Sequence, residues 1–147
     1  MRLAYEMKYI HPVSERTSIQ MVKYSPEYQN EYKQLYNDCY HKMREELNIQ
    51  PYDFIQDDSF FESGMENVYL LTDNDKIIGS VKIHNAEIDD LIVNCDFQGL
   101  GYGRQILLWT LEHIKTEPIV LRVAAWNIKA IGLYKKTGFE IVNTIKF

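Results

Sequence analysis

Cysteine is nearly absent from this chain of 147 residues, which has only Cys39 and Cys95. Two isolated cysteines form neither a disulfide framework nor a zinc site, so both are expected to be reduced thiols. His11, His41 and His113 fall on a terminal segment and on two predicted helices, without the spacing of metal ligands. The sequence therefore predicts no metal site.

Long apolar runs and linker-like segments are also absent. No stretch of about 18 apolar residues occurs, and the first residues, Met1–Glu6, already include charged side chains. Neither a membrane span nor a signal peptide is predicted from this pattern. Proline, glycine and serine do not cluster so as to divide the chain. We therefore expect one soluble, cytoplasmic domain that covers residues 1–147, with no membrane partner.

Positive charge is scarce over the first two thirds of the chain. Residues 1–100 have nine basic and eighteen acidic side chains, whereas residues 101–147 have seven and three. The formal net charge of -5 argues against nonspecific binding to nucleic acid. The basic C-terminal third favours a site for an anionic ligand, and the acidic remainder favours a cationic one. A solvated surface without a ligand explains the same distribution equally well.

The chain does have a regular succession of strand and helix patterns. An alternating strand at 18–24 is followed by Ser25-Pro26, a helix start, and by apolar residues three or four apart as far as Leu47. Residues 51–66 indicate a short helix within loops. The other predicted elements are strands at 67–72, 76–84 and 87–93, a helix at 104–115, a strand at 119–125, a helix at 127–136 and a strand at 139–147. This order predicts an α/β domain with a mixed, largely antiparallel central sheet flanked by helices.

A glycine-rich stretch joins the strand at 87–93 to the helix that follows it. Gly99, Gly101 and Gly103 let the backbone approach a ligand closely, and unpaired N–H groups converge where a helix begins. The stretch therefore predicts an anion site. Arg104 stands where a dinucleotide fingerprint needs a third glycine, and no Gly-Lys-Ser/Thr follows as in a P-loop.

Two motifs in this order resemble those of the GNAT superfamily of N-acetyltransferases. The first is Gln98-x-x-Gly101-x-Gly103, and the second combines Asn127, Ala130 and Tyr134 with the pair Gly138-Phe139. The resemblance spans residues 18–147 and is strongest from residue 87 onward. It implies an acetyl-CoA-dependent N-acetyltransferase with a parallel strand pair splayed around the cofactor site.

The resemblance also implies which residues bind acetyl-CoA. The backbone of Leu91, Ile92 and Val93 would pair with the pantetheine arm, and N–H groups of the glycine loop would hold the pyrophosphate. The loop residues are Gln98, Gly99, Leu100, Gly101, Tyr102 and Gly103, with Arg104, Lys129, Lys135 and Lys136 as basic residues that steer CoA. Asn127 fits a helix N-cap, a cofactor contact, or both.

Acetyl transfer needs a proton donor for the leaving sulfur and a proton acceptor for the amine. Tyr134 occupies the motif position of the donor, since a phenol stays protonated at neutral pH; its other interpretation is an aromatic core residue. Glu87 is the first candidate for the acceptor. Asp89, on the same strand face, and His84, acting through water, are alternatives. The other interpretation of Glu87 is an exposed carboxylate at the edge of the strand, without a role in catalysis. Strand alternation predicts that Asp90 points the other way. A backbone N–H near Leu91 or Ile92 is the expected stabiliser of the oxyanion.

The chain departs from the family pattern at both ends. Relatives commonly continue beyond the Gly-Phe strand into one more strand, and this chain instead begins with an extra segment, residues 1–17, that alternates like a strand from Leu3 to Ile10. We expect this segment, from the same chain or from a partner in a homodimer, to pair where the final strand would lie.

Three functions are compatible with these patterns. The first is direct transfer of an acetyl group, in a ternary complex, to a primary amine of a small molecule or peptide. The second is a noncatalytic acyl-CoA-binding or regulatory module on the same fold. The third is a protein-interaction domain whose glycine loop is only a tight turn. The acids Asp57, Asp58 and Glu62 favour a cationic acceptor.

Overall fold

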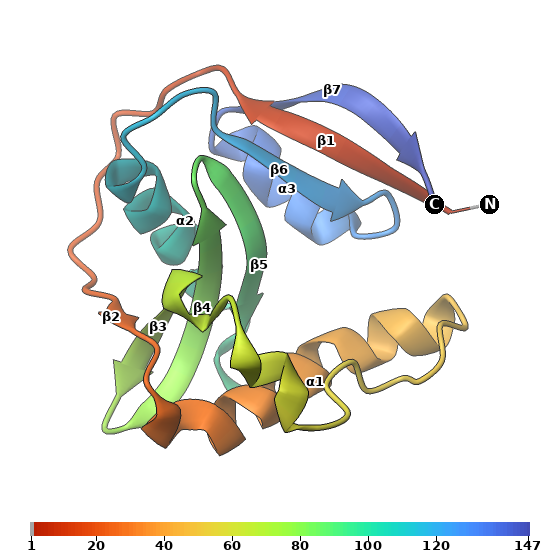
Figure 1. The fold of residues 1–147 in the computed structure, drawn as a ribbon. Helices are drawn as coiled ribbons and strands as arrows, with labels where there is room; N and C mark the ends of the chain where they lie inside the picture. Colours follow the sequence, from red (N-terminus) through yellow and green to blue (C-terminus); the bar gives the residue numbers. More distant parts are fainter. Residues whose placement is uncertain (1) are drawn as a thin grey trace.

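The computed structural model describes residues 2–147. One seven-stranded sheet with the order β2-β3-β4-β5-β6-β1-β7 forms the centre of the molecule (Figure 1). Its strands are β1 (Leu3–Tyr9), β2 (Val22–Lys23), β3 (Val68–Asp73), β4 (Lys76–His84), β5 (Glu87–Val93), β6 (Val120–Ala124) and β7 (Phe139–Lys146). The helices are α1 (Gln29–Glu46), α2 (Tyr102–His113) and α3 (Ile128–Lys136), with short 3-10 turns η1 (Pro26–Tyr28), η2 (Asp58–Glu62), η3 (Met65–Asn67) and η4 (Cys95–Phe97).

The sheet is antiparallel except between β5 and β6. These two strands pair in parallel at only two positions, Glu87 with Val120 and Ile88 with Leu121. Beyond Ile88 the two strands diverge, as Figure 1 shows. The predicted mixed sheet with one splayed parallel pair is therefore confirmed.

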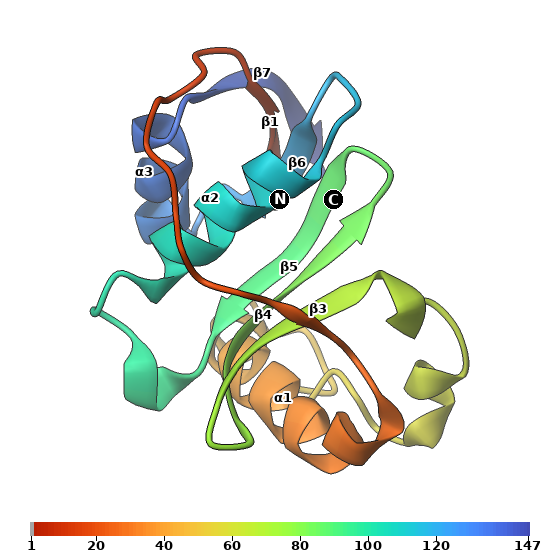
Figure 2. The same ribbon diagram turned by 90° about the vertical axis from the view of Figure 1, so that its left-hand side faces the viewer.

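Two apolar clusters cover the two faces of the sheet. Tyr32, Leu35 and Tyr36 of α1 pack with buried residues of β3, β4 and β5 on one face. Residues of α2 and α3, including Ile106 and Tyr134, pack on the other. Figure 2 shows α1 and α2 on opposite sides of β3, β4 and β5. The region where β5 diverges from β6 therefore has α1 on one face of the sheet and α2 and α3 on the other.

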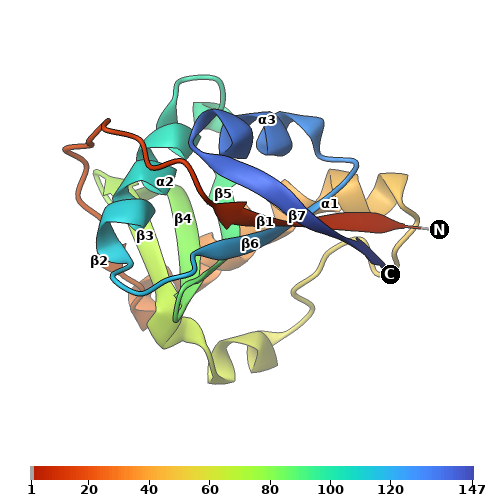
Figure 3. The ribbon, with the colours of Figure 1, turned by 90° about the horizontal axis from the view of Figure 1, so that it is seen from above.

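The N-terminal segment forms β1, which lies between β6 and β7 and is antiparallel to both. Met7 at its centre is fully buried. The chain then crosses the outside of α2 on its way to β2 (Figure 2), where the Thr17 hydroxyl donates to Gln105. Near the ends of the described chain, the Phe147 N–H donates to the Arg2 carbonyl at 2.9 Å (Figure 3). Met1 lies outside the described residues.

The predicted strand at 18–24 is wrong in extent. Only Val22 and Lys23 pair with β3. Thr17, just before this segment, is held by α2, because its hydroxyl donates to Gln105 and its N–H donates to Glu112 at 3.4 Å. Ile19 and Met21 pack against the core cluster that includes Ile106, so the alternation reflects core packing as well as pairing in a sheet.

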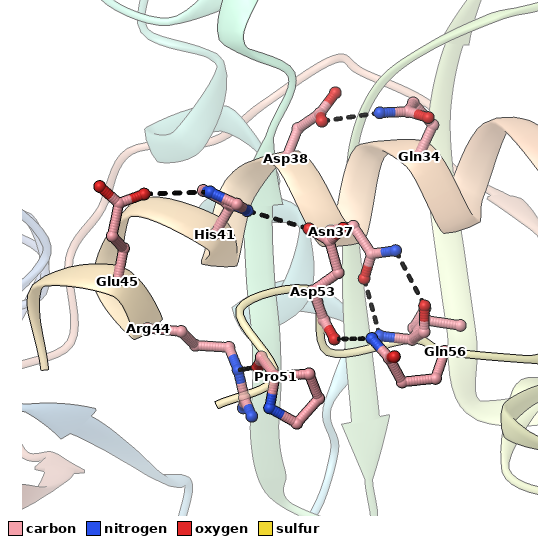
Figure 4. Close-up of polar contacts among 10 residues, drawn as sticks. Gln34, Asn37, Asp38, His41, Arg44, Glu45, Pro51, Asp53 and Gln56 are labelled. Atoms are coloured by element: carbon pink, nitrogen blue, oxygen red, sulfur yellow. Dashed lines mark hydrogen bonds and ion pairs between the residues drawn. The ribbon is translucent and has the colours of Figure 1, made fainter. Parts of the chain in front are cut away.

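The stretch at 51–66 contains the turns η2 and η3 and is anchored to α1. Asn37 accepts from the Ile55 N–H at 2.7 Å and donates to the Ile55 carbonyl at 3.0 Å. His41 contacts Asp53 at 3.0 Å and Arg44 donates to the Pro51 carbonyl at 2.8 Å (Figure 4). These bonds fix the segment along the side of α1. Within residues 2–147, no helix is both long and apolar enough to cross a membrane.

Candidate active site

A bulge in β5 shapes the site. Lys82 pairs with Asp89 and Ser80 with Ile92, so Asp90 and Leu91 together face a single residue of β4. Asp90 has a φ of 45°, a left-handed conformation that Asp tolerates better than most residues. A bulge of this kind redirects side chains and breaks the two-residue alternation of a strand. It also takes backbone groups at Asp90 and Leu91 out of the regular ladder, next to the expected oxyanion position.

A cleft of about 250 Å³ opens where β5 and β6 diverge. Residues of four elements line it: Cys39, Tyr40 and Met43 of α1; 88 and 90–93 of β5; 121–124 of β6; and Asn127, Ala130 and Tyr134 of α3, together with Gln98. A second hollow of about 360 Å³ lies between α2 and the segment that follows β1, and none of the motif residues lines it. The smaller cleft therefore brings Gln98 of the first motif together with Asn127, Ala130 and Tyr134 of the second.

The glycine loop forms an anion cradle at the start of α2. Gly99 and Gly101 have φ of 80° and 87°, and a Cβ at either position would meet no atom within 4 Å. The Gln105 N–H donates to the Gly101 carbonyl at 3.1 Å, so the N–H groups that precede it in the first turn have no partner within the helix. These donors and the helix dipole favour a phosphate. The start of α2 is thus suited to a phosphate group.

The neighbours of the loop hold it against the rest of the site. Gln98 donates through Nε2 to the Val93 carbonyl at 3.1 Å. A Cβ at Gly103 would lie in ordinary van der Waals contact with Leu133 at 3.6 Å and with Val93 at 3.7 Å, so α2 is close to both β5 and α3 at this point. Arg104 binds the Glu15 carboxylate through its guanidinium. The basic residues Lys129, Lys135 and Lys136 are exposed on α3.

Tyr134 lies on α3 with its side chain buried at the cleft. Burial, assisted by the negative charge of Asp90, raises the pKa of its hydroxyl to about 12. The hydroxyl is therefore protonated at neutral pH and can donate. The Tyr134 ring also packs edge-on against Phe139, with centroids 6.0 Å apart, so the residue belongs to the core as well.

Asn127 caps α3. Its side-chain oxygen accepts from the Ala130 N–H at 3.2 Å, which satisfies one of the unpaired donors at the helix start. The same residue lines the cleft. Capping is therefore established by geometry, and a cofactor contact remains a separate prediction.

Alternation predicts that Asp90 faces the other way from Glu87 and Asp89, and it is Asp90, not either of those two, that lines the cleft. Its oxygens accept from the Tyr40 hydroxyl at 2.8 Å and from the Tyr36 hydroxyl at 3.0 Å. Burial raises the pKa of Asp90, and the two hydrogen bonds oppose that rise. Asp90 was missed as a site residue because the acid was sought on the face of β5 that carries Glu87 and Asp89. The one sequence signal was the i, i+4 pair of tyrosines on α1.

The other predicted acid–base residues lie nearer the start of β5. Glu87 pairs with His84 of β4 and with Val120 of β6, and neither it nor Asp89 is among the described residues that line the cleft. Burial, followed by the charge of Glu87, raises the pKa of Asp89. Of the two predicted catalytic residues, Tyr134 lines the cleft and Glu87 does not.

The two cysteines flank the strand that enters the loop. Cys39 donates through Sγ to the Val93 carbonyl at 3.4 Å, and burial raises its pKa to about 12. Cys95 is exposed in η4. Among residues 2–147, no three His, Cys, Asp or Glu side chains are grouped as metal ligands.

The sequence was compared with protein families and with known proteins. The profile described as the acetyltransferase (GNAT) family matches residues 25–139. A peptidyl-lysine N-acetyltransferase, YjaB, from Salmonella typhimurium is 30% identical over 73 residues, 48% of each chain. A ribosomal protein bS18-alanine N-acetyltransferase from the same organism is 35% identical over 66 residues, which are 43% of this chain and 45% of that protein. The aligned segment spans about half the length of these two relatives.

Solved structures show the same fold at low identity. An N-acetyltransferase from Staphylococcus aureus Mu50 superimposes with a TM-score of 0.69 and 13% identity, over 87% of this chain and 94% of that one. At this level of identity the likeness concerns the fold alone.

Proposed function

The chain belongs to the acetyltransferase (GNAT) family, and we propose that it is an acetyl-CoA-dependent N-acetyltransferase that acts on a primary amine of a small molecule or peptide. One observation carries this proposal: the glycine loop at the start of α2 and the buried hydroxyl of Tyr134 belong to the region where β5 diverges from β6. An anion cradle beside a cleft with a proton donor is what transfer from an acyl-CoA requires.

Acetyl-CoA supplies an acetyl group activated as a thioester. The N–H groups around Gly101 and Gly103 would hold its pyrophosphate, and the backbone of β5 from Leu91 to Val93 would pair with its pantetheine arm. Backbone groups freed by the bulge at Asp90 and Leu91 are placed to stabilise an oxyanion near the thioester carbonyl. In this arrangement the chain positions the thioester and leaves the acceptor side of the cleft to the amine.

Two proton transfers remain for side chains. Tyr134 donates to the departing sulfur, since its hydroxyl is protonated over the neutral range. An alkylammonium must lose a proton before it can attack. The role that the sequence gives to Glu87 in this step requires a water relay, because Glu87 does not line the cleft.

A peptide acceptor is favoured over a small molecule by the names of the two curated relatives, which specify a peptidyl lysine and the alanine of a ribosomal protein. Both are primary amines, one on a side chain and one at an N-terminus. We propose the same chemical class for this chain.

Calorimetric titration with acetyl-CoA tests the cofactor half of the proposal. We expect micromolar binding, weakened at least about tenfold by Gly101→Ala, since the added Cβ enters the space of the ligand and strains a residue with φ of 87°. Gly64→Ala is the matched control, because Gly64, the N-cap of η3, has a φ of 83° and lies outside the glycine loop, and an added Cβ would meet only the flexible end of Lys82 at 3.2 Å. Both changes should lower stability similarly, and only Gly101→Ala should weaken binding.

The other outcomes separate the alternatives. Well-folded protein that binds neither acetyl-CoA nor longer acyl-CoAs would favour a protein-interaction domain. Acetyl-CoA binding without transfer to any peptide or small amine would favour a noncatalytic acyl-CoA module.

A further inference from the structure

Asp90 is a half-buried carboxylate that forms no ion pair with the described residues, although the charge of Lys82 acts on it from beyond ion-pair distance. Within residues 2–147, every ion pair of 4.0 Å or less involves other acids. Its two hydrogen bonds come from neutral hydroxyl groups, those of Tyr36 and Tyr40. Transfer of a carboxylate from water into a protein is unfavourable unless it is paired. An acid without an ion-pair partner that lines a cleft is therefore suited to a cationic ligand.

The carboxylate still has capacity to accept hydrogen bonds. Tyr40 donates to Oδ1 and Tyr36 to Oδ2, and a carboxylate offers about four acceptor positions. The remaining positions suit an ammonium group, which carries three N–H donors. The two tyrosines at the same time fix the orientation of the carboxylate, since both extend from the rigid helix α1.

The position of Asp90 depends on the bulge. A left-handed residue in a strand that is not glycine stores strain, and such residues concentrate at functional sites. Here the extra residue brings the Asp90 carboxylate toward α1 and into the same cleft that Tyr134 lines from α3. One carboxylate and one phenol thus face a single space from different elements.

We propose that Asp90 binds the ammonium group of the acceptor substrate and takes its proton directly, so that the acceptor is recognised as a primary alkylammonium. This assignment rests on the proposed N-acetyltransferase function. It gives Asp90, and not Glu87 through water, the role of proton acceptor.

The proton and electron balance of the step is complete. The ammonium gives one proton to the Asp90 carboxylate, and the nitrogen lone pair then forms a C–N bond to the thioester carbonyl carbon. The C–S bond breaks as the tetrahedral adduct collapses, and the sulfur takes a proton from Tyr134. The phenolate of Tyr134 recovers a proton from the amide nitrogen, and Asp90 releases its own to solvent. The net products are an amide, free CoA thiol and one proton.

The charge of Asp90 affects how readily Tyr134 donates its proton. The negative charge of Asp90 is the second cause, after burial, of the raised pKa of Tyr134. When Asp90 accepts the ammonium proton, that charge is removed and Tyr134 becomes a stronger acid. The proton donor is thus strengthened after the amine has been made nucleophilic.

The titratable groups that surround Asp90 belong to four elements. They are Tyr32, Tyr36 and Tyr40 on α1, Lys82 on β4, Asp89 on β5 and Tyr134 on α3. Burial raises the pKa of Tyr36 and Tyr40, so both remain hydrogen-bond donors over the working range. The acid side of a pH–rate profile should therefore report mainly on Asp90.

The first test compares substitutions with two peptide probes, one with a single lysine and a blocked N-terminus, the other with a free N-terminal alanine and no lysine. Asp90→Asn should lower kcat/KM by about 100-fold or more at pH 7, measured with the peptide that the wild-type protein acetylates. The affinity for acetyl-CoA, measured by calorimetry, should be retained. Glu87→Gln should produce a smaller loss. Asp38→Asn, on the exposed side of α1 (Figure 4), is the control and should not change activity. A larger loss for Glu87→Gln than for Asp90→Asn overturns the assignment.

A second variant covers the case in which Asp90→Asn does not fold. Tyr40→Phe removes one hydrogen bond from the carboxylate, so the acid midpoint of kcat/KM should move to higher pH by about one unit. A residue that only anchors α1 to β5 would change stability and leave this midpoint in place, which would count against the proposal.

A third measurement does not depend on finding the substrate. In protein labelled with ¹³C at aspartate carboxyls, the Asp90 resonance is identified by its loss in Asp90→Asn. It should show a carboxylate at pH 7, with a midpoint that falls when propylammonium is added. A carboxyl that stays protonated at pH 7, or that ignores propylammonium, overturns the Asp90 assignment even if the protein acetylates a peptide. The reverse result, a responsive Asp90 in a protein that neither binds acetyl-CoA nor acetylates, refutes the proposed function instead.

Discussion

Gly138 packs directly against the backbone of His11. The Gly138 carbonyl accepts from the His11 N–H at 2.9 Å and from the Ile10 N–H at 3.0 Å. A Cβ at Gly138 would lie 2.1 Å from the His11 carbonyl oxygen, and the φ of Gly138 is 110°. The turn between α3 and β7 is thus built around the chain that leaves β1.

Gly138→Ala should therefore be strongly destabilising. A left-handed conformation costs about 1–2 kcal/mol for a residue with a Cβ, and overpacking adds about 1–3 kcal/mol. Urea unfolding should show a much lower midpoint. Gly132→Ala is the control, since Gly132 lies inside α3 with open space around it and should be neutral or stabilising by up to about 1 kcal/mol. Equal midpoints for the two variants would mean that the contact with His11 is not formed in solution.

Met7→Ala tests whether β1 belongs to the sheet. Met7 is fully buried and pairs with Leu121 on one side and Ile141 on the other. Truncation of such a residue costs about 2–5 kcal/mol. Glu6→Gln, next to it, loses only the exposed ion pair with Arg122 at 3.9 Å, which contributes about 0–1 kcal/mol. Thermal denaturation of both variants measures the difference, and similar melting temperatures would place β1 outside the cooperative fold.

Tyr134→Phe should lower kcat by about 100-fold or more and leave acetyl-CoA affinity nearly unchanged, since it removes a proton donor and keeps the ring that packs on Phe139. Tyr69→Phe is a suitable control, because that ring packs against Trp109 at 5.2 Å and does not line the cleft. Steady-state kinetics with the peptide probes, together with calorimetry, separate the two effects. Full activity of Tyr134→Phe would remove the residue from the mechanism.

The pH dependence of the wild-type protein follows from the raised pKa of Tyr134. With a pKa of about 12, the hydroxyl stays protonated up to pH 10, so kcat should show no alkaline loss from this group below that pH. The folded state binds this proton more tightly than the unfolded state, whose pKa is about 10. The free energy of unfolding should therefore decrease as the pH rises from about 10 to about 12. An alkaline loss of kcat near pH 8 that vanishes in Tyr134→Phe would contradict this burial.

Asn127 variants separate capping from cofactor binding. Asn127→Ala removes the bond to the Ala130 N–H and should cost about 1 kcal/mol of stability, whereas Asn127→Asp keeps a cap and should restore most of it. If Asn127 also contacts acetyl-CoA, both variants should weaken binding, because Asp cannot donate as the amide does. Unchanged affinity in Asn127→Ala would limit the residue to capping.

The parts of the site that could be predicted from the sequence are local in the chain. The loop from Gln98 to Gly103 and the helix cap at Asn127 each depend on neighbours within a few residues, so residue type and spacing determine them. The location of β1 could be predicted only by combining its alternation with a family pattern. The strand at 18–24 was overestimated because Ile19 and Met21 pack on the core without pairing in the sheet, and alternation alone does not separate the two.

Asp90 could not be assigned for a different reason. Alternation indicates which face of β5 Asp90 occupies, but the bulge opposite β4 is a property of the pairing, not of β5 alone. The tyrosines that bind Asp90 lie 54 and 50 residues earlier in the chain. A residue that is defined by a register shift and by distant partners has no signature in a single sequence.

The place of β1 between β6 and β7 has a consequence for folding. Residues 3–9 are synthesised long before Val120–Ala124 and Phe139–Lys146, the two strands that flank them. Closing so long a loop is entropically costly, and contacts between distant segments slow the folding of a domain. The hairpin β3–β4 and helix α1 can assemble early, whereas β1 can pair with β6 only after the whole segment between residues 9 and 120 has been closed into a loop. We therefore expect the wall of the cleft that β6 provides to form last, so that acetyl-CoA binding during refolding would appear with the slowest phase.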